Sequence, residues 1–276
     1  METNLNKFSK VKLNNEMEIP WIGLGTYGIH GKDVLRSIEN AYEAGYRLID
    51  TAKSYGNEKE IGDALKTLKI PRNDIFITTK LDPSDHGYKS ALNGFEQSLK
   101  KLQLEYVDLY LVHWPNSSKR LESWKAFEEL YSKGLCKSIG VSNYTESHLK
   151  ELLDNSSVVP AVNQIEFNPY CVQDDILSYC KTKNIQVEGY TPLARMHTGG
   201  RTERNKMAEK YGKTKAQVFL RWSLKHGVIP IPKSSNKERI YENIDIFDFE
   251  LSEDEMEILD SFDEKLRSSP DPYNIK

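Results

Sequence analysis

Short apolar runs recur along the chain at a spacing of about thirty residues, which is the length of one β-α unit. The runs are rich in β-branched and aromatic residues, and the stretches between them carry apolar residues at helical spacing. Eight runs are predicted as strands, over residues 21–27, 47–52, 75–81, 107–114, 138–144, 162–167, 186–193 and 228–234.

Helices are predicted between these runs. The clearest amphipathic stretches cover 33–45, 57–69, 90–104, 120–134 and 145–153. Gly45 and Gly134 follow helix ends, and Asn143 or Thr145 is suited to cap the helix that comes next. Before the first strand, two short runs flank Asn14-Asn15, a pair that tolerates left-handed turn geometry, so a β-hairpin is predicted there.

Eight β-α units with nearly continuous apolar strands indicate a parallel sheet covered by helices. Closure into a (β/α)8 TIM barrel is the natural solution for that number of units, and an open doubly wound sheet is the alternative. No linker-like stretch rich in Pro, Gly or Ser divides the chain, so residues 1–276 are interpreted as a single barrel domain. The tail 267–276 is expected to run over the surface.

Composition narrows the class of protein. Hydrophobic residues are 38% and charged residues 29% of the chain, which is typical of a soluble globular protein, and a net charge of −3 argues against a nucleic-acid partner. Three cysteines without a C-x-x-C pair and a polar amino terminus favour a reducing, cytoplasmic compartment. No apolar run is long enough to span a membrane, and the scattered histidines show no metal-ligand spacing.

A glycine motif suggests a different fold at first sight. Gly23, Gly25 and Gly28 form a G-x-G-x-x-G pattern, and Asp50 follows at about the distance of the ribose-binding acid of a Rossmann unit. In that motif the glycines open a helix directly, whereas Ile29-His30-Gly31 intervenes here. The Rossmann interpretation is therefore disfavoured.

A second short motif suggests a catalytic pair on one helix. Tyr55 and Lys59 fit Y-x-x-x-K, the acid–base pair of short-chain dehydrogenases. Gly56-Asn57 makes this stretch a poor helix interior, so Lys59 is interpreted as an exposed residue near the start of the following helix.

Chemically versatile side chains stand at the carboxyl ends of three neighbouring predicted strands, where a barrel has its active site. Asp50 ends the second strand and Tyr55 follows it, Lys80 ends the third, and His113 ends the fourth. Each alone has an ordinary interpretation as a helix cap or a satisfied core residue, although a buried ammonium needs a partner. Their convergence favours one shared site.

The residue types predict carbonyl reduction. A phenol has a pKa of about 10, and a nearby ammonium is expected to lower it. Asp50 can hold Lys80 toward Tyr55, and His113 can donate a hydrogen bond to the same carbonyl oxygen. Such a set binds and protonates a developing alkoxide. The hydride must come from elsewhere, which implies a nicotinamide cofactor.

The later strand ends offer groups for that cofactor. Ser142, Asn143 and Gln164 can hydrogen-bond a carboxamide, and Tyr190 offers a face on which a nicotinamide ring can stack. After the last strand comes a cationic, hydroxyl-rich loop suited to a phosphate, with Lys233, Ser234, Ser235, Asn236 and Arg239. The ordinary interpretation of that loop is an exposed Lys-Ser-rich surface.

Three long motifs in order carry a family resemblance. They are "GYRLIDTAKSYGNEKEIG" (45–62), Phe127 with "KSIGVSNY" (137–144), and "IPKSSNKERIYEN" (231–243). The chain resembles an aldo-keto reductase over nearly its whole length, including bacterial and protist aldehyde or diketo-acid reductases and prostaglandin F synthase-like members.

The resemblance implies that Asp50, Tyr55, Lys80 and His113 form a catalytic tetrad, with Tyr55 as general acid. It implies that NADPH is the cofactor and is preferred over NADH, because Lys233 and Arg239 would bind the 2′-phosphate. The implied cofactor-binding residues are Gly25, Thr26, Asp50, Ser142, Asn143, Gln164, Tyr190, Thr191, Leu193, Lys233, Ser234, Ser235, Asn236, Arg239, Glu242 and Asn243.

Short loops after the fourth and seventh strands imply an open substrate pocket edged by Tyr27, Tyr55, His113 and Trp114. The expected substrate is a small carbonyl compound, and the protein is expected to be a monomer without a membrane partner. The alternative is an NADPH-binding regulatory subunit, similar to those of membrane channels, with little turnover. Isomerisation or aldol cleavage would leave the loop 233–243 without a role.

Overall fold

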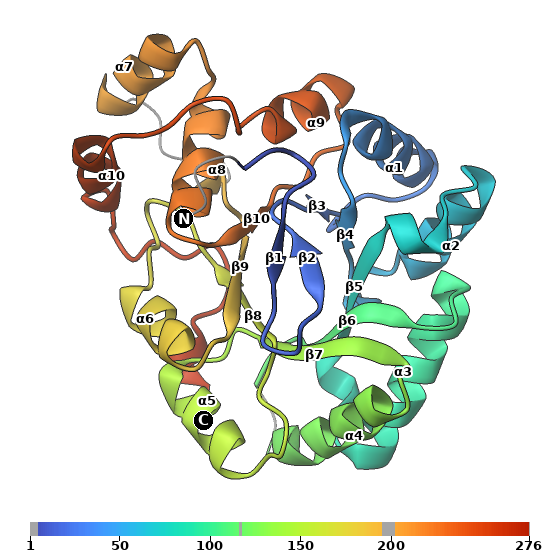
Figure 1. Ribbon diagram of the computed structural model, residues 1–276. Helices are drawn as coiled ribbons and strands as arrows, with labels where there is room; N and C mark the ends of the chain where they lie inside the picture. The colour runs from blue at the N-terminus through green and yellow to red at the C-terminus, as the bar shows by residue number, and fades with distance from the viewer. Residues whose placement is uncertain (1–4, 116–117, 195–201, 276) are drawn as a thin grey trace.

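The computed structural model describes residues 5–115, 118–194 and 202–275, and it has eight parallel strands ringed by helices (Figure 1). All eight predicted strands are present; seven are shorter than predicted, and the fifth has the predicted length but begins and ends two residues earlier. They are β3 (Leu24–Gly25), β4 (Leu48–Asp50), β5 (Phe76–Leu81), β6 (Val107–Val112), β7 (Cys136–Ser142), β8 (Val162–Glu166), β9 (Gln186–Tyr190) and β10 (Ile229–Ile231).

The ring closes between the last and first of these strands. The strands pair in chain order from β3 to β10, and a parallel bridge joins Gly25 to Lys233. Gly23 N donates to Pro230 O at 3.1 Å, and Gly25 N donates to Pro232 O at 3.0 Å. The prolines offer carbonyls but no N–H, which keeps the ladder at this seam short. Closure confirms the barrel and excludes the open sheet.

The helices cover the outside of the barrel. The five helices named from the sequence are present with bounds shifted by one or two residues at most of their ends. The described helices are α1 (Lys32–Ala44), α2 (Glu58–Thr67), α3 (Tyr88–Leu102), α4 (Arg120–Ser132), α5 (Glu146–Asp154), α6 (Asp174–Thr182), α7 (Thr202–Tyr211), α8 (Lys215–Lys225), α9 (Lys237–Ile244) and α10 (Glu253–Asp260).

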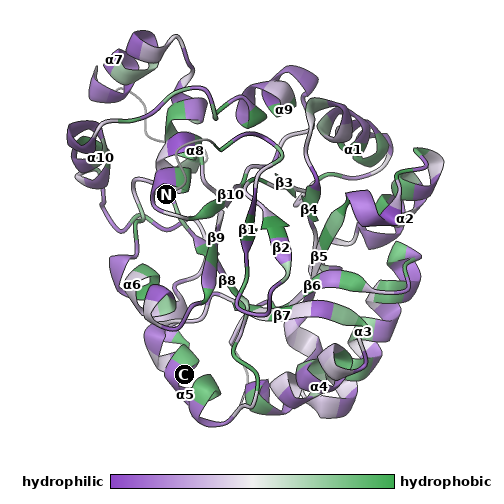
Figure 2. Cartoon of the chain, viewed as in Figure 1, coloured by the Kyte–Doolittle hydropathy of each residue, from purple (hydrophilic) through white to green (hydrophobic). Residues whose placement is uncertain are grey.

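Local signals explain several helix ends. Gly45 closes α1 in the left-handed region with φ 115°, and Thr145, rather than Asn143, is the N-cap of α5. Figure 2 shows hydrophobic colouring on the strands, whereas the peripheral helices α7 and α10 are mostly hydrophilic. Within the described ranges, no helix has both the length and the apolar character needed to cross a membrane.

The predicted hairpin, β1 (Lys10–Lys12) with β2 (Glu18–Pro20), lies across one end of the barrel (Figure 1). The prediction for its turn was wrong in detail, because Glu16 takes the left-handed conformation at φ 71° instead of Asn14 or Asn15. Both asparagine side chains reach the barrel: Asn14 Nδ2 donates to Pro160 O at 2.9 Å, and Asn15 Nδ2 donates to Lys137 O at 2.9 Å. They tie the hairpin to the amino-terminal ends of the strands.

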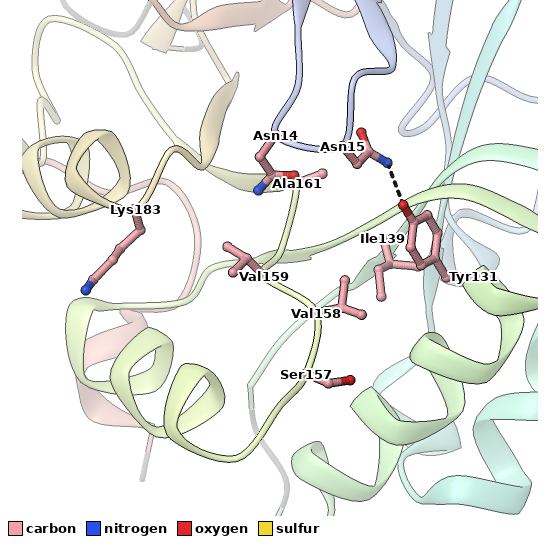
Figure 3. Close-up of a pocket in the computed structure, with 9 residues that line it drawn as sticks. All are labelled: Asn14, Asn15, Tyr131, Ile139, Ser157, Val158, Val159, Ala161 and Lys183. Atoms are coloured by element: carbon pink, nitrogen blue, oxygen red, sulfur yellow. Dashed lines mark hydrogen bonds between the residues drawn. The ribbon is translucent and has the colours of Figure 1, made fainter.

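A cavity of about 310 Å³ lies beside this hairpin (Figure 3). Asn15 Nδ2 lies 3.5 Å from Tyr131 Oη at its edge, and apolar side chains such as Val158 and Ile139 line it. Since it opens at the amino-terminal face, it is separate from the strand ends where a barrel carries its chemistry.

Candidate active site

The four residues predicted for catalysis come from adjacent strand ends at the other face. Lys80 is the penultimate residue of β5, and its side chain is 0% exposed. Its Nζ donates to Asp50 Oδ1 at 2.7 Å, to Thr51 O at 3.0 Å and to Tyr55 Oη at 3.2 Å. The buried ammonium therefore has its carboxylate partner, and its remaining hydrogen bonds hold it against the phenol.

The Tyr55 ring stands in an aromatic cluster. Its centroid lies 5.1 Å from that of Tyr27 and 5.7 Å from the His113 imidazole, both in edge-to-face geometry. Tyr27 is 66% exposed, so the cluster opens to solvent on that side. The structure thus brings together Tyr27, Asp50, Tyr55, Lys80 and His113.

Burial governs the protonation of this site. Burial raises the pKa of Tyr55, while the Lys80 ammonium lowers it and Asp50 raises it, so the net direction is upward. The sequence predicts the effect of Lys80 but not the larger effect of burial. The pKa of Lys80 is raised although burial opposes this, because Asp50 and Tyr55 favour its charged form. Near neutral pH the phenol keeps its proton and Lys80 keeps its charge.

His113 is neutral at working pH. Burial, and then the charge of Lys80, lower its pKa to about 3. Ser54 Oγ lies 3.3 Å from Nδ1, which suits the tautomer that carries its proton on Nε2. Asn143 Nδ2 donates to the His113 backbone carbonyl at 3.0 Å and holds this strand end in position.

Asn57 organises the loop that carries Tyr55, a role missed from the sequence. Its side chain is 0% exposed, and it accepts from Thr51 Oγ1 at 2.8 Å. Its Nδ2 donates to Thr26 O at 2.9 Å and Ile29 O at 3.0 Å, so it fastens the β3–α1 loop that presents Tyr27. Lys59 lies in the first turn of α2 and is exposed, as predicted, and it pairs with Asp63 at 2.7 Å.

Trp114 lies at the edge of the site and is held through a histidine that the sequence reasoning did not select. His86 Nε2 lies 3.0 Å from Trp114 O, and His86 Nδ1 lies 3.0 Å from Ser123 Oγ. Burial lowers the pKa of His86. The loop after β6 includes residues 116–117, and the loop after β9 includes 195–201, so the predicted shortness of both loops falls partly outside the described residues.

The groups predicted to hold a carboxamide lie together at the ends of β7, β8 and β9. Ser142 Oγ donates to Gln164 O at 2.8 Å, and Asn143 Nδ2 donates to Ser142 Oγ at 3.1 Å. Tyr190 Oη donates to Asn143 Oδ1 at 2.8 Å. Asn143 and Thr191 both have positive φ, at 63° and 52°. For β-branched Thr191 this is a strained conformation of the kind that collects at functional sites.

The predicted phosphate loop connects β10 to α9. Asn236 caps this helix by accepting from Arg239 N at 2.9 Å, and Ser234 Oγ accepts from Asn236 N at 3.1 Å. Lys233 and Arg239 are exposed, and neither has an ion-pair partner among the described residues. Two unpaired cations at a helix start fit a bound phosphate.

The remaining predicted cofactor residues have mixed environments. Thr26 Oγ1 donates to Asp50 O at 2.9 Å, and a Cβ at Gly25 would lie 3.1 Å from Ile231 O, so the strands approach closely there. Asn243 is buried, Leu193 is half-buried, and Ser235 is exposed. Glu242, predicted to contact adenine, accepts from Thr214 Oγ1 at 2.6 Å.

Comparison with known proteins identifies the family. Residues 21–264 match the model of the aldo/keto reductase family. The glyoxal reductase of Bacillus subtilis is 44% identical over 266 residues, covering 96% of each chain.

Two solved structures extend this result. MGS-M4, an aldo-keto reductase from a deep-sea metagenome library, has a TM-score of 0.93 at 42% identity, over 96% of this chain and 99% of that one. An aldo-keto reductase of Bombyx mori in complex with NADP has a TM-score of 0.88 at 35% identity, over 95% of both chains. The chain therefore belongs to the aldo/keto reductase family, and as such it is an NADP-dependent oxidoreductase of aldehydes and ketones.

Proposed function

We propose that this protein reduces small aldehydes and ketones to alcohols with NADPH, and that Tyr55 is the general acid. The observation that carries the proposal is the 3.2 Å contact between Lys80 Nζ and Tyr55 Oη, beside the 2.7 Å pair of Lys80 with Asp50. The bound cofactor supplies the hydride. The protein's own groups supply the proton and the positioning.

Each group of the tetrad has a separate part in the proton transfer. The raised pKa of Tyr55 keeps the hydroxyl protonated, ready to donate to the carbonyl oxygen as negative charge develops there. Lys80 stabilises the phenolate that remains, and Asp50 keeps Lys80 charged and oriented. Neutral His113 donates a hydrogen bond from Nε2 to the same oxygen and brings no competing acidic proton.

The cofactor would lie across the carboxyl ends of β7 to β10. Ser142, Asn143 and Gln164 would hold its carboxamide, and Tyr190 would support the ring. The phosphate loop would bind the 2′-phosphate through Lys233, Ser234, Asn236 and Arg239. The rest of the cofactor-binding site would be lined by Gly25, Thr26, Thr191, Leu193, Ser235, Glu242 and Asn243. The unpaired cations of the loop support NADPH as the preferred form.

The open aromatic edge supports a small substrate. Tyr27, whose ring contacts Tyr55 edge-to-face, is mostly exposed and Trp114 is half-buried, so the described part of this edge is open to solvent. A relative at 44% identity is named a glyoxal reductase. We therefore propose short α-oxoaldehydes as the first substrates to test. Nothing in the comparisons favours the regulatory-subunit alternative, and the monomeric state stays a prediction.

The test is Tyr55→Phe. General acid catalysis is worth about 10²- to 10⁴-fold, so kcat for aldehyde reduction should fall by that factor while the NADPH dissociation constant stays within about twofold. Tyr144→Phe is the matched control, because Tyr144 is buried, its ring contacts His148 rather than the tetrad, and its hydroxyl has no hydrogen-bond partner in the described structure. Full activity in Tyr55→Phe would refute the proposal.

A further inference from the structure

A second carboxyl group, on Glu188, lies inside the barrel below the tetrad. Glu188 is in the middle of β9, and its side chain is 0% exposed. In the sheet register it is level with Gln164 on β8 and with Ile229 on β10. The roles proposed above for the tetrad and the cofactor residues make no use of it.

A continuous line of contacts joins Glu188 to the proposed acid. Gln164 Nε2 lies 3.0 Å from Glu188 Oε2 and 2.8 Å from Asp50 Oδ2, so one amide group donates to both carboxyl groups. Asp50 Oδ1 then accepts from Lys80, which also contacts Tyr55. The amide orientation follows from its neighbours, since both are acceptors and only the NH₂ group can donate.

The environment of Glu188 favours its neutral form. Its second oxygen, Oε1, has no hydrogen-bond partner in the described residues, and a buried carboxylate without a cation is costly. The charged groups that face it are Asp50 on β4 and Lys80 on β5. Burial and then Asp50 raise its pKa to about 8, whereas the hydrogen bond from Gln164 and the charge of Lys80 lower it.

We propose that Glu188 is a positioning residue that acts through Gln164 and Asp50, and that its loss of a proton at alkaline pH keeps Tyr55 protonated and so extends the pH range of carbonyl reduction. This inference depends on the function proposed for Tyr55. Below its ionisation Glu188 is a neutral hydrogen-bond partner of Gln164. Above it, a second negative charge beside Asp50 disfavours phenolate formation, so a higher pH is needed to remove the proton from Tyr55.

The experiment measures kcat for glyoxal reduction by NADPH from about pH 6 to about pH 10 in wild type and Glu188→Gln. Glutamine keeps the shape and the oxygen that accepts from Gln164, but it cannot ionise. The two enzymes should agree within about twofold near pH 6, where both side chains are neutral. Near pH 10 the variant should be about two- to fivefold slower, since a downward shift of one pKa unit in a phenol that titrates at or above its ordinary value of about 10 lowers the protonated fraction by that factor.

A purely structural role would lower kcat by the same factor at every pH. Glu58→Gln is the matched control: Glu58 is 1% exposed, but it lies outside this line of contacts and accepts from Thr79 Oγ1 at 2.7 Å. Its pH profile should match that of wild type.

A second measurement makes the result independent of turnover. The infrared difference spectrum between wild type and Glu188→Gln should show a carboxylic-acid band at pH 7 that disappears above about pH 9, given the raised pKa. Superimposable pH profiles, or a Glu188 already ionised at pH 7, would overturn the inference. If Tyr55→Phe is inactive while Glu188→Gln behaves as wild type, this inference fails alone. If Tyr55→Phe is active, the proposed function fails first.

Discussion

The polar side chains at the two ends of the barrel differ in whether they already have hydrogen-bond or ion-pair partners within the protein. At the amino-terminal end, the amide groups of Asn14 and Asn15 donate hydrogen bonds to the backbone carbonyls of Pro160 and Lys137. At the carboxyl-terminal end, Lys233 and Arg239 have no ion-pair partner in the described structure, and Tyr27 is mostly exposed. At the amino-terminal end the polar groups are hydrogen-bonded within the protein, whereas at the carboxyl-terminal end polar groups remain available to bind a ligand.

This contrast predicts that changes at one end alter activity and that changes at the other end alter stability. Lys80 is the exception, because it serves both purposes. It is buried, it is paired with Asp50, and it contacts the proposed acid. The following substitutions test how far the separation holds.

The largest effect is expected for Lys80→Met. Removing one partner of a buried ion pair costs about 3–5 kcal/mol of unfolding free energy, because Asp50 is left uncompensated. Loss of the group that stabilises phenolate should also lower kcat by about 10²- to 10⁴-fold. Urea unfolding and steady-state kinetics measure the two effects. Lys59→Met, which removes an exposed lysine of α2, should leave both unchanged.

Arg239→Ala should impair cofactor selection without affecting the fold. A hydrogen bond to a charged group is worth about 1.5–3 kcal/mol, so the KM for NADPH should rise about ten- to a hundredfold, while the KM for NADH changes little. Lys10→Ala removes a cation at the opposite end and is the control. An equal rise for both cofactors would show that Arg239 does not read the 2′-phosphate.

Asn15→Ala should destabilise the protein and leave catalysis intact. The variant leaves Lys137 O without its side-chain donor and also loses the 3.1 Å bond to Ser138 Oγ, so the unfolding free energy should fall by about 1–3 kcal/mol. Urea unfolding gives the first value, and kcat at saturating substrate gives the second. A fall in kcat that matches the loss of stability would break the separation between the two ends.

His113 should give the protein a pH dependence of stability that is absent at pH 7 and grows only on acidification. Its pKa in the folded protein is about 3, below the unfolded value, so the unfolded chain binds the proton first as pH falls. Stability due to neutral His113 is complete above about pH 6.5 and is lost by about 1.4 kcal/mol per pH unit below it. Unfolding at pH 7, 6 and 5 should show a steeper decline in wild type than in His113→Gln. Equal slopes would contradict this.

The sequence predicted the barrel correctly, and it placed Asp50, Tyr55, Lys80 and His113 at strand ends that the structure brings together, because strand ends and residue types are both visible in a sequence. The catalytic roles of these residues stay predictions. The sequence did not predict the effects that depend on how deeply a side chain is buried. Glu188 sits in "QVEGY", which reads as an ordinary strand, and only the closed barrel shows that its side chain is buried beside Gln164. The same lack of depth hid the effect of burial on Tyr55.

Side-chain contacts between segments far apart in the chain could not be predicted from the sequence either. Asn57 looks like a turn residue in the sequence, yet it binds the backbone of the β3–α1 loop. Asn14 and Asn15 were chosen for their backbone tolerance, whereas their amide groups prove to be what matters and Glu16 makes the turn. Propensity describes the local chain, and these contacts depend on what the rest of the chain brings nearby.

The seam between Gly25 and Lys233 has a consequence for how the protein acquires function during synthesis. It joins the first strand of the barrel to the last, so it closes the longest loop in the sheet. Closing a long loop costs more conformational entropy than closing a short one, so we expect this pairing to form late in folding. The strands bearing Asp50, Lys80 and His113 leave the ribosome long before β10. A nascent chain can therefore contain all four residues of the proposed tetrad before the residues that close the barrel, and those of the proposed phosphate loop, have been synthesised.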